Sequence, residues 1–232
     1  MLHKDLYPDL EPIVRGSTWK KLFDWFHLAG MLRYSTQQHL RNIGKYGLYD
    51  GQYKLQDLGK QFGSKQKIKK FIEIGLLTAV NNAYKITDKV IQILKDESFN
   101  VRILKQADGE GTGHELAVSS ALVKIMREPH FYAAFYYDFG FLRPDSVVIH
   151  KKDSAYKITM LEVEQEKPDW LEYLKDKRDK YNKLAQDEEI YSKWWKVYSE
   201  KLGFPFCSQD KFCFSVLTNS KIQFEAEGWN WL

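Results

Sequence analysis

The chain has 232 residues, 44% of them hydrophobic and 28% charged, which is typical of a globular protein with one large domain or two small ones. A net charge of +4 and a pI near 8.8 permit nucleic-acid binding without requiring it. The sequence has no apolar run of membrane-span length, no signal-peptide pattern and only two cysteines, so we expect a cytoplasmic protein that does not contact a membrane.

The first hundred residues show the pattern expected of a winged helix. Apolar residues recur at helical spacing in four segments, which are 19–26, 37–43, 55–62 and 64–74. Ser35 is the expected N-cap of the second. Residues 76–80 and 84–86 then alternate as two short strands around an Asn81-Asn82 turn, and Thr87 precedes a closing helix. Helices followed by a small hairpin favour a winged helix-turn-helix over residues 1–100.

The helix over 64–74 is the candidate DNA-binding element. It has an apolar stripe, and lysines crowd the remaining surface at positions Lys65, Lys67, Lys69 and Lys70. In a winged helix this element would lie in the major groove, with Asn82 of the wing at a phosphate or the minor groove. Lysines predict phosphate contacts better than base-specific ones. A solvated helix face, or a protein-docking role, is the alternative.

Residues 96–112 form an expected connector, rich in Gly and acidic residues, so we place a second domain at 101–232. The predicted order in that domain is one helix, three strands, a helix, a second charged helix and a last strand pair. The corresponding ranges are 114–126, 131–139, 145–149, 155–164, a helix from 168, 188–201, 212–217 and 221–224. The expected fold class is therefore α/β (α+β).

Three acidic residues lie on the second and third of these strands. Asp145 opens one strand, and Glu162 and Glu164 are two residues apart on the next, so both should point to one face. If the two strands form a hairpin, the three carboxylates converge. Clustered carboxylates need a cation, a strong donor or protonation, and oxygen ligands of this kind suit a hard divalent metal.

The order of elements and these acids resemble the PD-(D/E)XK nuclease superfamily, with Pro144-Asp145 and Glu162-Val163-Glu164 in its two motif positions. The whole chain resembles the replication-relaxation family, which joins a winged helix to a nuclease-like domain. Four local features carry that resemblance, and they are Gly113-His114-Glu115-Leu116-Ala117-Val118, Arg143-Pro144-Asp145, Leu161-Glu162-Val163-Glu164 and Lys177-Arg178-Asp179-Lys180-Tyr181.

The resemblance implies a restriction-endonuclease-like domain with a catalytic centre of Asp145, Glu162 and Glu164. Mg²⁺ or Mn²⁺ would bind Asp145 and Glu162, and Glu115 could complete the shell. The position that holds lysine in the superfamily holds Glu164 here, and a carboxylate cannot offset phosphate charge. Lys177, on the next helix, could supply the missing cation.

Each of these residues also has a structural interpretation. Asp145 could be a turn residue, Glu162 and Glu164 the outward face of an edge strand, Lys177 a solvated cation and Tyr181 a core residue. Two functions remain open. One is a DNA-binding accessory protein of a plasmid, phage or integrative element, acting on double-stranded DNA in replication, relaxation or mobilisation, with further such proteins as partners and a degenerate nuclease-like domain. The other is a metal-dependent endonuclease or nickase.

Overall fold

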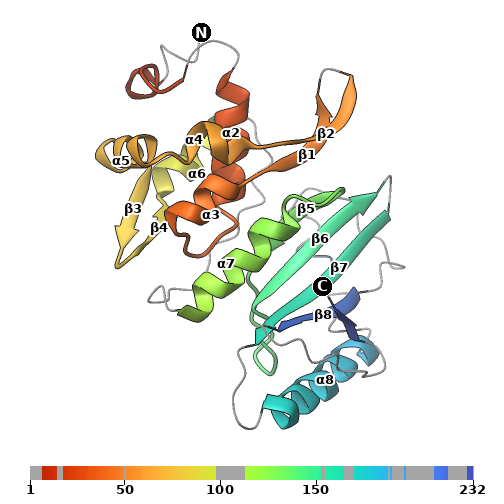
Figure 1. The fold of residues 1–232 in the computed structure, drawn as a ribbon. Coiled ribbons are helices and arrows are strands. Elements are labelled where there is room, and N and C mark those ends of the chain that lie inside the picture. Colours follow the sequence, from red (N-terminus) through yellow and green to blue (C-terminus); the bar gives the residue numbers. More distant parts are fainter. Residues whose placement is uncertain are drawn as a thin grey trace. The chain divides into compact units, whose positions relative to one another are not determined.

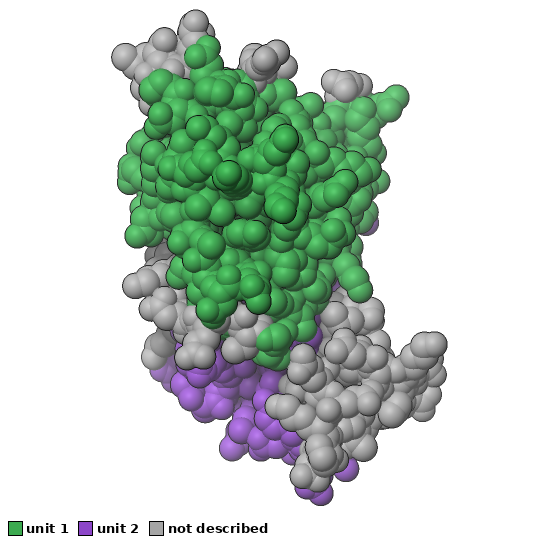
Figure 2. All heavy atoms as spheres, turned by 60° about the vertical axis from the view of Figure 1, so that its left-hand side comes forward, with its two compact units in different colours: residues 1–103, 108–129 green, residues 104–107, 130–232 purple. Residues whose placement is uncertain are grey.

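The computed structural model describes residues 7–14, 18–49, 51–97, 113–152, 155–164, 170–187, 189, 196, 212–218 and 229–231. The chain is a mixed α+β protein with antiparallel hairpins and one larger sheet (Figure 1). It divides into two compact units, coloured separately in Figure 2: residues 1–103 with 108–129, and residues 104–107 with 130–232. No helix in the described part is long and apolar enough to cross a membrane.

The first unit contains seven helical segments and two hairpins among its described residues. In chain order they are η1 (Pro8–Leu10), α2 (Trp19–Ala29), α3 (Gln37–Asn42), β1 (Lys45–Tyr49), β2 (Gln52–Gln56), α4 (Leu58–Phe62), α5 (Lys65–Glu73), β3 (Leu77–Val80), β4 (Ala83–Ile86), α6 (Asp88–Asp96) and α7 (Gly113–Ile125). Trp25 of α2 is fully buried and lies against the rings of Phe26, Phe62 and Phe71. This aromatic cluster ties α2, α4 and α5 into one core.

The boundaries around α5 agree with the sequence. Ser64 caps α5 by accepting a hydrogen bond from the Lys67 amide, and Gly75 follows the helix with φ of +73°, a conformation that favours glycine. β3 and β4 pair antiparallel around Asn81 and Asn82, as predicted.

Two local predictions in this unit are wrong. Residues 45–56 form the hairpin β1–β2, so Leu55 lies in a strand and the helix begins only at Leu58. Apolar residues at 55, 58 and 62 mimic a helical period, but the turn at Gly51, with φ of +73°, begins strand β2, which includes Leu55. The N-cap of α3 is Thr36, because the Ser35 backbone pairs with Tyr84 of β4 instead.

The helix α7 belongs to the first unit, although the sequence placed it at the start of the second domain. Its Ser119 hydroxyl donates to the Tyr34 carbonyl, and its Glu115 carboxylate is 3.2 Å from the Arg33 guanidinium. These contacts join residues about eighty positions apart, which no local pattern indicates.

The second unit is built on a five-stranded sheet in the order β5-β6-β7-β8-β9. Its elements are β5 (Phe131–Phe135), β6 (Ser146–Lys152), β7 (Ala155–Glu164), α8 (Trp170–Gln186), β8 (Phe212–Thr218) and β9 (Trp229–Trp231). The first three strands are antiparallel, whereas β8 runs parallel to β7 and β9 parallel to β8. Parallel neighbours need a crossover, and α8 lies in the connection between β7 and β8.

The predicted strands and the helix that follows them are confirmed for β6, β7, α8 and β8, while β5 ends earlier than expected. β9 was not predicted. The predicted helix over 188–201 and the strand over 221–224 lie outside the described residues, apart from single helical positions at 189 and 196. β7 is a central strand, and Leu161, Glu162 and Val163 are all buried on it. The edge-strand interpretation of Glu162 is therefore wrong.

Candidate functional site

The acidic residues Asp145 and Glu162 are neighbours at the sheet of the second unit. Ser146 of β6 pairs with Leu161 of β7, so Asp145, directly before β6, lies beside Glu162 in the antiparallel register. Asp145 Oδ2 accepts a hydrogen bond of 2.7 Å from the Val163 amide. The predicted proximity of the two residues agrees with this register, and the prediction that their carboxylates share one cation stays a prediction.

Two residues of α8 bind Glu162. Lys177 Nζ donates to Glu162 Oε2 at 2.5 Å, and the Tyr181 hydroxyl donates to Oε1. Lys177 and Tyr181 are four residues apart, so they share one face of the helix. Lys177 Nζ also lies 4.7 Å from the centre of the Tyr173 ring, one turn earlier. A single face of α8 thus supplies a cation, a hydroxyl and an aromatic ring.

Burial controls the electrostatics of this group. Glu162 and Tyr181 are 0% exposed and Lys177 is 8% exposed. Burial, followed by the charge of Asp145, raises the pKa of Glu162 to about 8, although Lys177 and Tyr181 oppose the shift. Burial and the Glu162 carboxylate raise the pKa of Tyr181 well above its usual value. The carboxyl of Glu162 therefore holds a proton to a much higher pH than an exposed glutamate.

The described carboxylates do not form a complete metal shell as they are placed. Both Glu162 oxygens accept from protein donors, one Asp145 oxygen accepts from a backbone amide, and Glu115 is ion-paired with Arg33 in the first unit. The described residues contain no group of three or more His, Cys, Asp or Glu side chains that could hold a metal. The side chain of Glu164 lies outside the described part.

The predicted DNA-binding lysines divide into two pairs. Lys65 and Lys69 are exposed one turn apart on α5. Lys67 instead donates to the Gln61 carbonyl at 2.8 Å and lies over the Phe62 ring, and this partial burial lowers its pKa. Lys70 lies 3.6 Å from Glu73 of the same helix. Asn82 is exposed at the tip of the β3–β4 hairpin.

The sequence missed the role of Tyr181, which was assigned to the core. It is fully buried, but its hydroxyl also binds Glu162. The spacing of Tyr173, Lys177 and Tyr181, each four residues from the next, was the available signal, because it places all three on one face of α8. No protein-family model, curated protein or solved structure matches this chain.

Proposed function

We propose that the chain is a DNA-binding accessory protein whose first unit binds duplex DNA through α5 and the β3–β4 hairpin. The observation that carries this proposal is the position of Lys65 and Lys69. They are exposed one turn apart, and neither side chain makes an ion pair or hydrogen bond with the described part of the chain. Two ammonium groups so arranged can neutralise neighbouring phosphates. The α4–α5 pair and the hairpin after it follow the order expected of a winged helix.

We propose in addition that the second unit is a nuclease-like scaffold that does not cleave DNA. The order of β5, β6, β7, α8 and β8, with β8 parallel to β7, is the order that the nuclease superfamily implies. Glu162, the residue that would anchor the metal there, is fully buried with both oxygens bound by Lys177 and Tyr181. Such a network supports a structural role for the carboxylate.

The family resemblance supplies the biological context of the proposal. It implies a protein of a plasmid, phage or integrative element, working in the cytoplasm in DNA replication, relaxation or mobilisation. Other replication or mobilisation proteins would then be its partners, and double-stranded DNA its ligand.

Replacing Lys65 and Lys69 by Ala is expected to weaken binding to every duplex sequence. Each lost phosphate contact lowers the slope of log affinity against log salt by about 0.9, so the double variant should lose about two units. Fluorescence anisotropy of a labelled duplex at several salt concentrations measures both quantities. The matched control is Lys20→Ala with Lys95→Ala, which removes two exposed lysines of α2 and α6. Equal slopes for wild type and the α5 variant would exclude α5 as the DNA-binding surface.

A metal-dependent endonuclease or nickase is the second candidate function. It is favoured by the neighbouring Asp145 and Glu162, with the Lys177 ammonium 2.5 Å from Glu162. This function requires Glu162 to release Lys177 and Tyr181. A bound Mg²⁺ or Mn²⁺ would activate water for attack on the phosphodiester.

Supercoiled plasmid incubated with the protein, with and without Mg²⁺ or Mn²⁺, distinguishes the two functions. We expect the wild-type protein to bind the plasmid and leave it supercoiled on an agarose gel. Metal-dependent nicking that is lost in both Asp145→Ala and Glu162→Ala would establish the enzyme instead. Nicking that survives both substitutions would point to a contaminating nuclease.

A further inference from the structure

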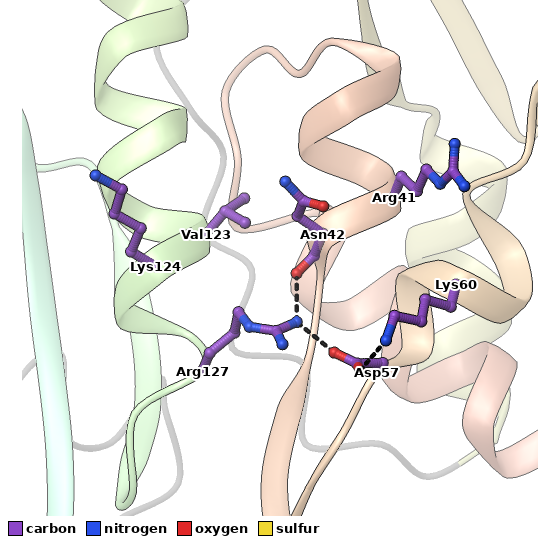
Figure 3. Close-up of a pocket in the computed structure, with 7 residues that line it drawn as sticks. All are labelled: Arg41, Asn42, Asp57, Lys60, Val123, Lys124 and Arg127. Atoms are coloured by element: carbon purple, nitrogen blue, oxygen red, sulfur yellow. Dashed lines mark hydrogen bonds and ion pairs between the residues drawn. The ribbon is translucent and has the colours of Figure 1, made fainter.

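A cleft of about 410 Å³ lies in the first unit, and none of the α5 lysines lines it. Its lining comes from the end of α3, the start of α4 and the end of α7, and consists of Arg41, Asn42, Asp57, Lys60, Val123, Lys124 and Arg127 (Figure 3). Four of these side chains are cations and one is a carboxylate. The sequence did not indicate this cluster, because its members are spread over nearly ninety positions.

The helix α4 approaches the end of α3, which carries Arg41 and Asn42 of the cleft, very closely. A Cβ added at Gly59 would lie 2.2 Å from the Arg41 carbonyl oxygen, and one at Gly63 would lie 2.6 Å from the Arg41 Cα. The Gly59 amide donates to the Ile43 carbonyl at 2.7 Å. Two glycines one turn apart therefore hold the backbone of Arg41 in place, which any larger residue would displace.

Arg127 is fixed at the centre of the cleft. Its Nη1 donates to the Asn42 carbonyl at 3.0 Å and lies 2.6 Å from Asp57 Oδ1. The other oxygen of Asp57 lies 2.8 Å from Lys60 Nζ. These two cations lower the pKa of Asp57, with Lys60 as the largest cause, so the carboxylate stays charged and keeps Arg127 oriented.

Arg41 and Lys124 complete the lining and have no such partner. In Figure 3 they lie on opposite sides of the Arg127–Asp57 pair. Both are exposed, and neither side chain makes a hydrogen bond or ion pair with the described residues. The cleft thus contains one carboxylate and four cations, and the excess positive charge is available to an anion from outside.

We infer that this cleft binds a phosphate group. A tetrahedral oxyanion beside the Arg127–Asp57 pair can take hydrogen bonds from the remaining donors of Lys60 and Arg127, and the exposed side chains of Arg41 and Lys124 would turn inward from either side to complete the site. The volume is within the range of small-molecule sites, so either a free nucleotide or a phosphate of a nucleic-acid backbone can supply the group. The inference uses none of the residues of the proposed α5 surface and goes beyond the proposed function.

The test is a titration of the ¹⁵N-labelled full chain with inorganic phosphate at constant ionic strength, followed by NMR. We expect saturable shifts of the amides of Asn42, Val123 and Lys124, and none with chloride. In Arg41→Ala with Lys124→Ala, the dissociation constant should rise about tenfold or more, because two charge-assisted hydrogen bonds are lost. The control Lys20→Ala with Lys95→Ala should bind like wild type. No saturable shifts in wild type, or an equal loss in the control, would overturn the inference.

Two further titrations identify the source of the phosphate. If a nucleotide supplies it, ATP should bind the wild type more tightly than phosphate does, and the cleft variant should lose that gain. If a DNA backbone supplies it, Arg41→Ala with Lys124→Ala should weaken duplex binding about tenfold. The same two substitutions, added to Lys65→Ala with Lys69→Ala, should lower the salt slope of duplex binding further. Phosphate binding that persists when the α5 variant has lost DNA separates this site from the proposed function. A cleft variant that binds phosphate, ATP and duplex as wild type does would refute it.

Discussion

Lys177→Met is expected to destabilise the protein by about 1–2 kcal/mol at pH 9, because Glu162, whose pKa is about 8 beside Lys177, must then keep its proton or stay buried without its cation. Methionine fills a similar volume, so the loss reports the charge and not a cavity. The effect should be smaller at pH 6, where Glu162 takes up a proton and needs no counter-charge. Urea denaturation followed by circular dichroism at the two pH values measures the difference in free energy of unfolding.

The matched control for this result is the double variant Glu162→Gln with Lys177→Met. It removes both charges, so most of the stability lost in the single variant should return. A single variant as stable as wild type at pH 9 would mean that the Glu162–Lys177 pair is solvated, contrary to its burial.

Glu162→Gln is expected to change how stability depends on pH. The pKa of Glu162 is about 8 in the folded protein and 4.5 for a glutamate without interactions, which represents the unfolded state. Between these two pH values the folded state keeps a proton that the unfolded state releases. Raising the pH therefore favours unfolding, by up to about 1.4 kcal/mol per pH unit. The contribution of Glu162 is fully present below about pH 4.5 and is lost as the pH rises through 8.

Glutamine has no proton to release, so the variant should lack this slope, and its stability relative to wild type should increase steadily from pH 5 to pH 8. Asp145→Asn offers a second check, because removing the neighbouring charge lowers the pKa of Glu162 and moves the slope to lower pH. Parallel stability curves for wild type and Glu162→Gln would show that the carboxyl titrates as an exposed one does.

The sequence predicted the pair of acidic residues because their placement depends on local rules. Two strands joined by a short turn are antiparallel neighbours, and the register that joins Ser146 to Leu161 places Asp145 beside Glu162. The proximity of Lys177 was anticipated only as one option, since helix α8 follows β7 directly in the chain. Its partner Tyr181 was assigned to the core because an aromatic residue at helical spacing gives no sign of where its hydroxyl points.

The features that escaped prediction depend on contacts between distant segments. The cleft forms because Gly59 and Gly63 admit the backbone of α3, and because Arg127 of the segment after α7 reaches Asp57. Similarly, α7 joins the first unit through Arg33 and Tyr34. Periodicity and turn residues describe only neighbouring positions, so they cannot show which helix packs against another.

The parallel pairing of β7 with β8 has a consequence for the order in which the protein folds. Glu164 pairs with Thr218, more than fifty residues later, whereas the hairpins β1–β2 and β3–β4 close over two-residue turns. Closing a long segment loses more chain entropy before any contact forms, and topologies rich in such contacts fold slowly. We therefore expect the two hairpins of the first unit to form early during refolding. The Glu162–Lys177–Tyr181 group, on the strand and helix that must be assembled with β8, should reach its final hydrogen bonding in the slowest phase.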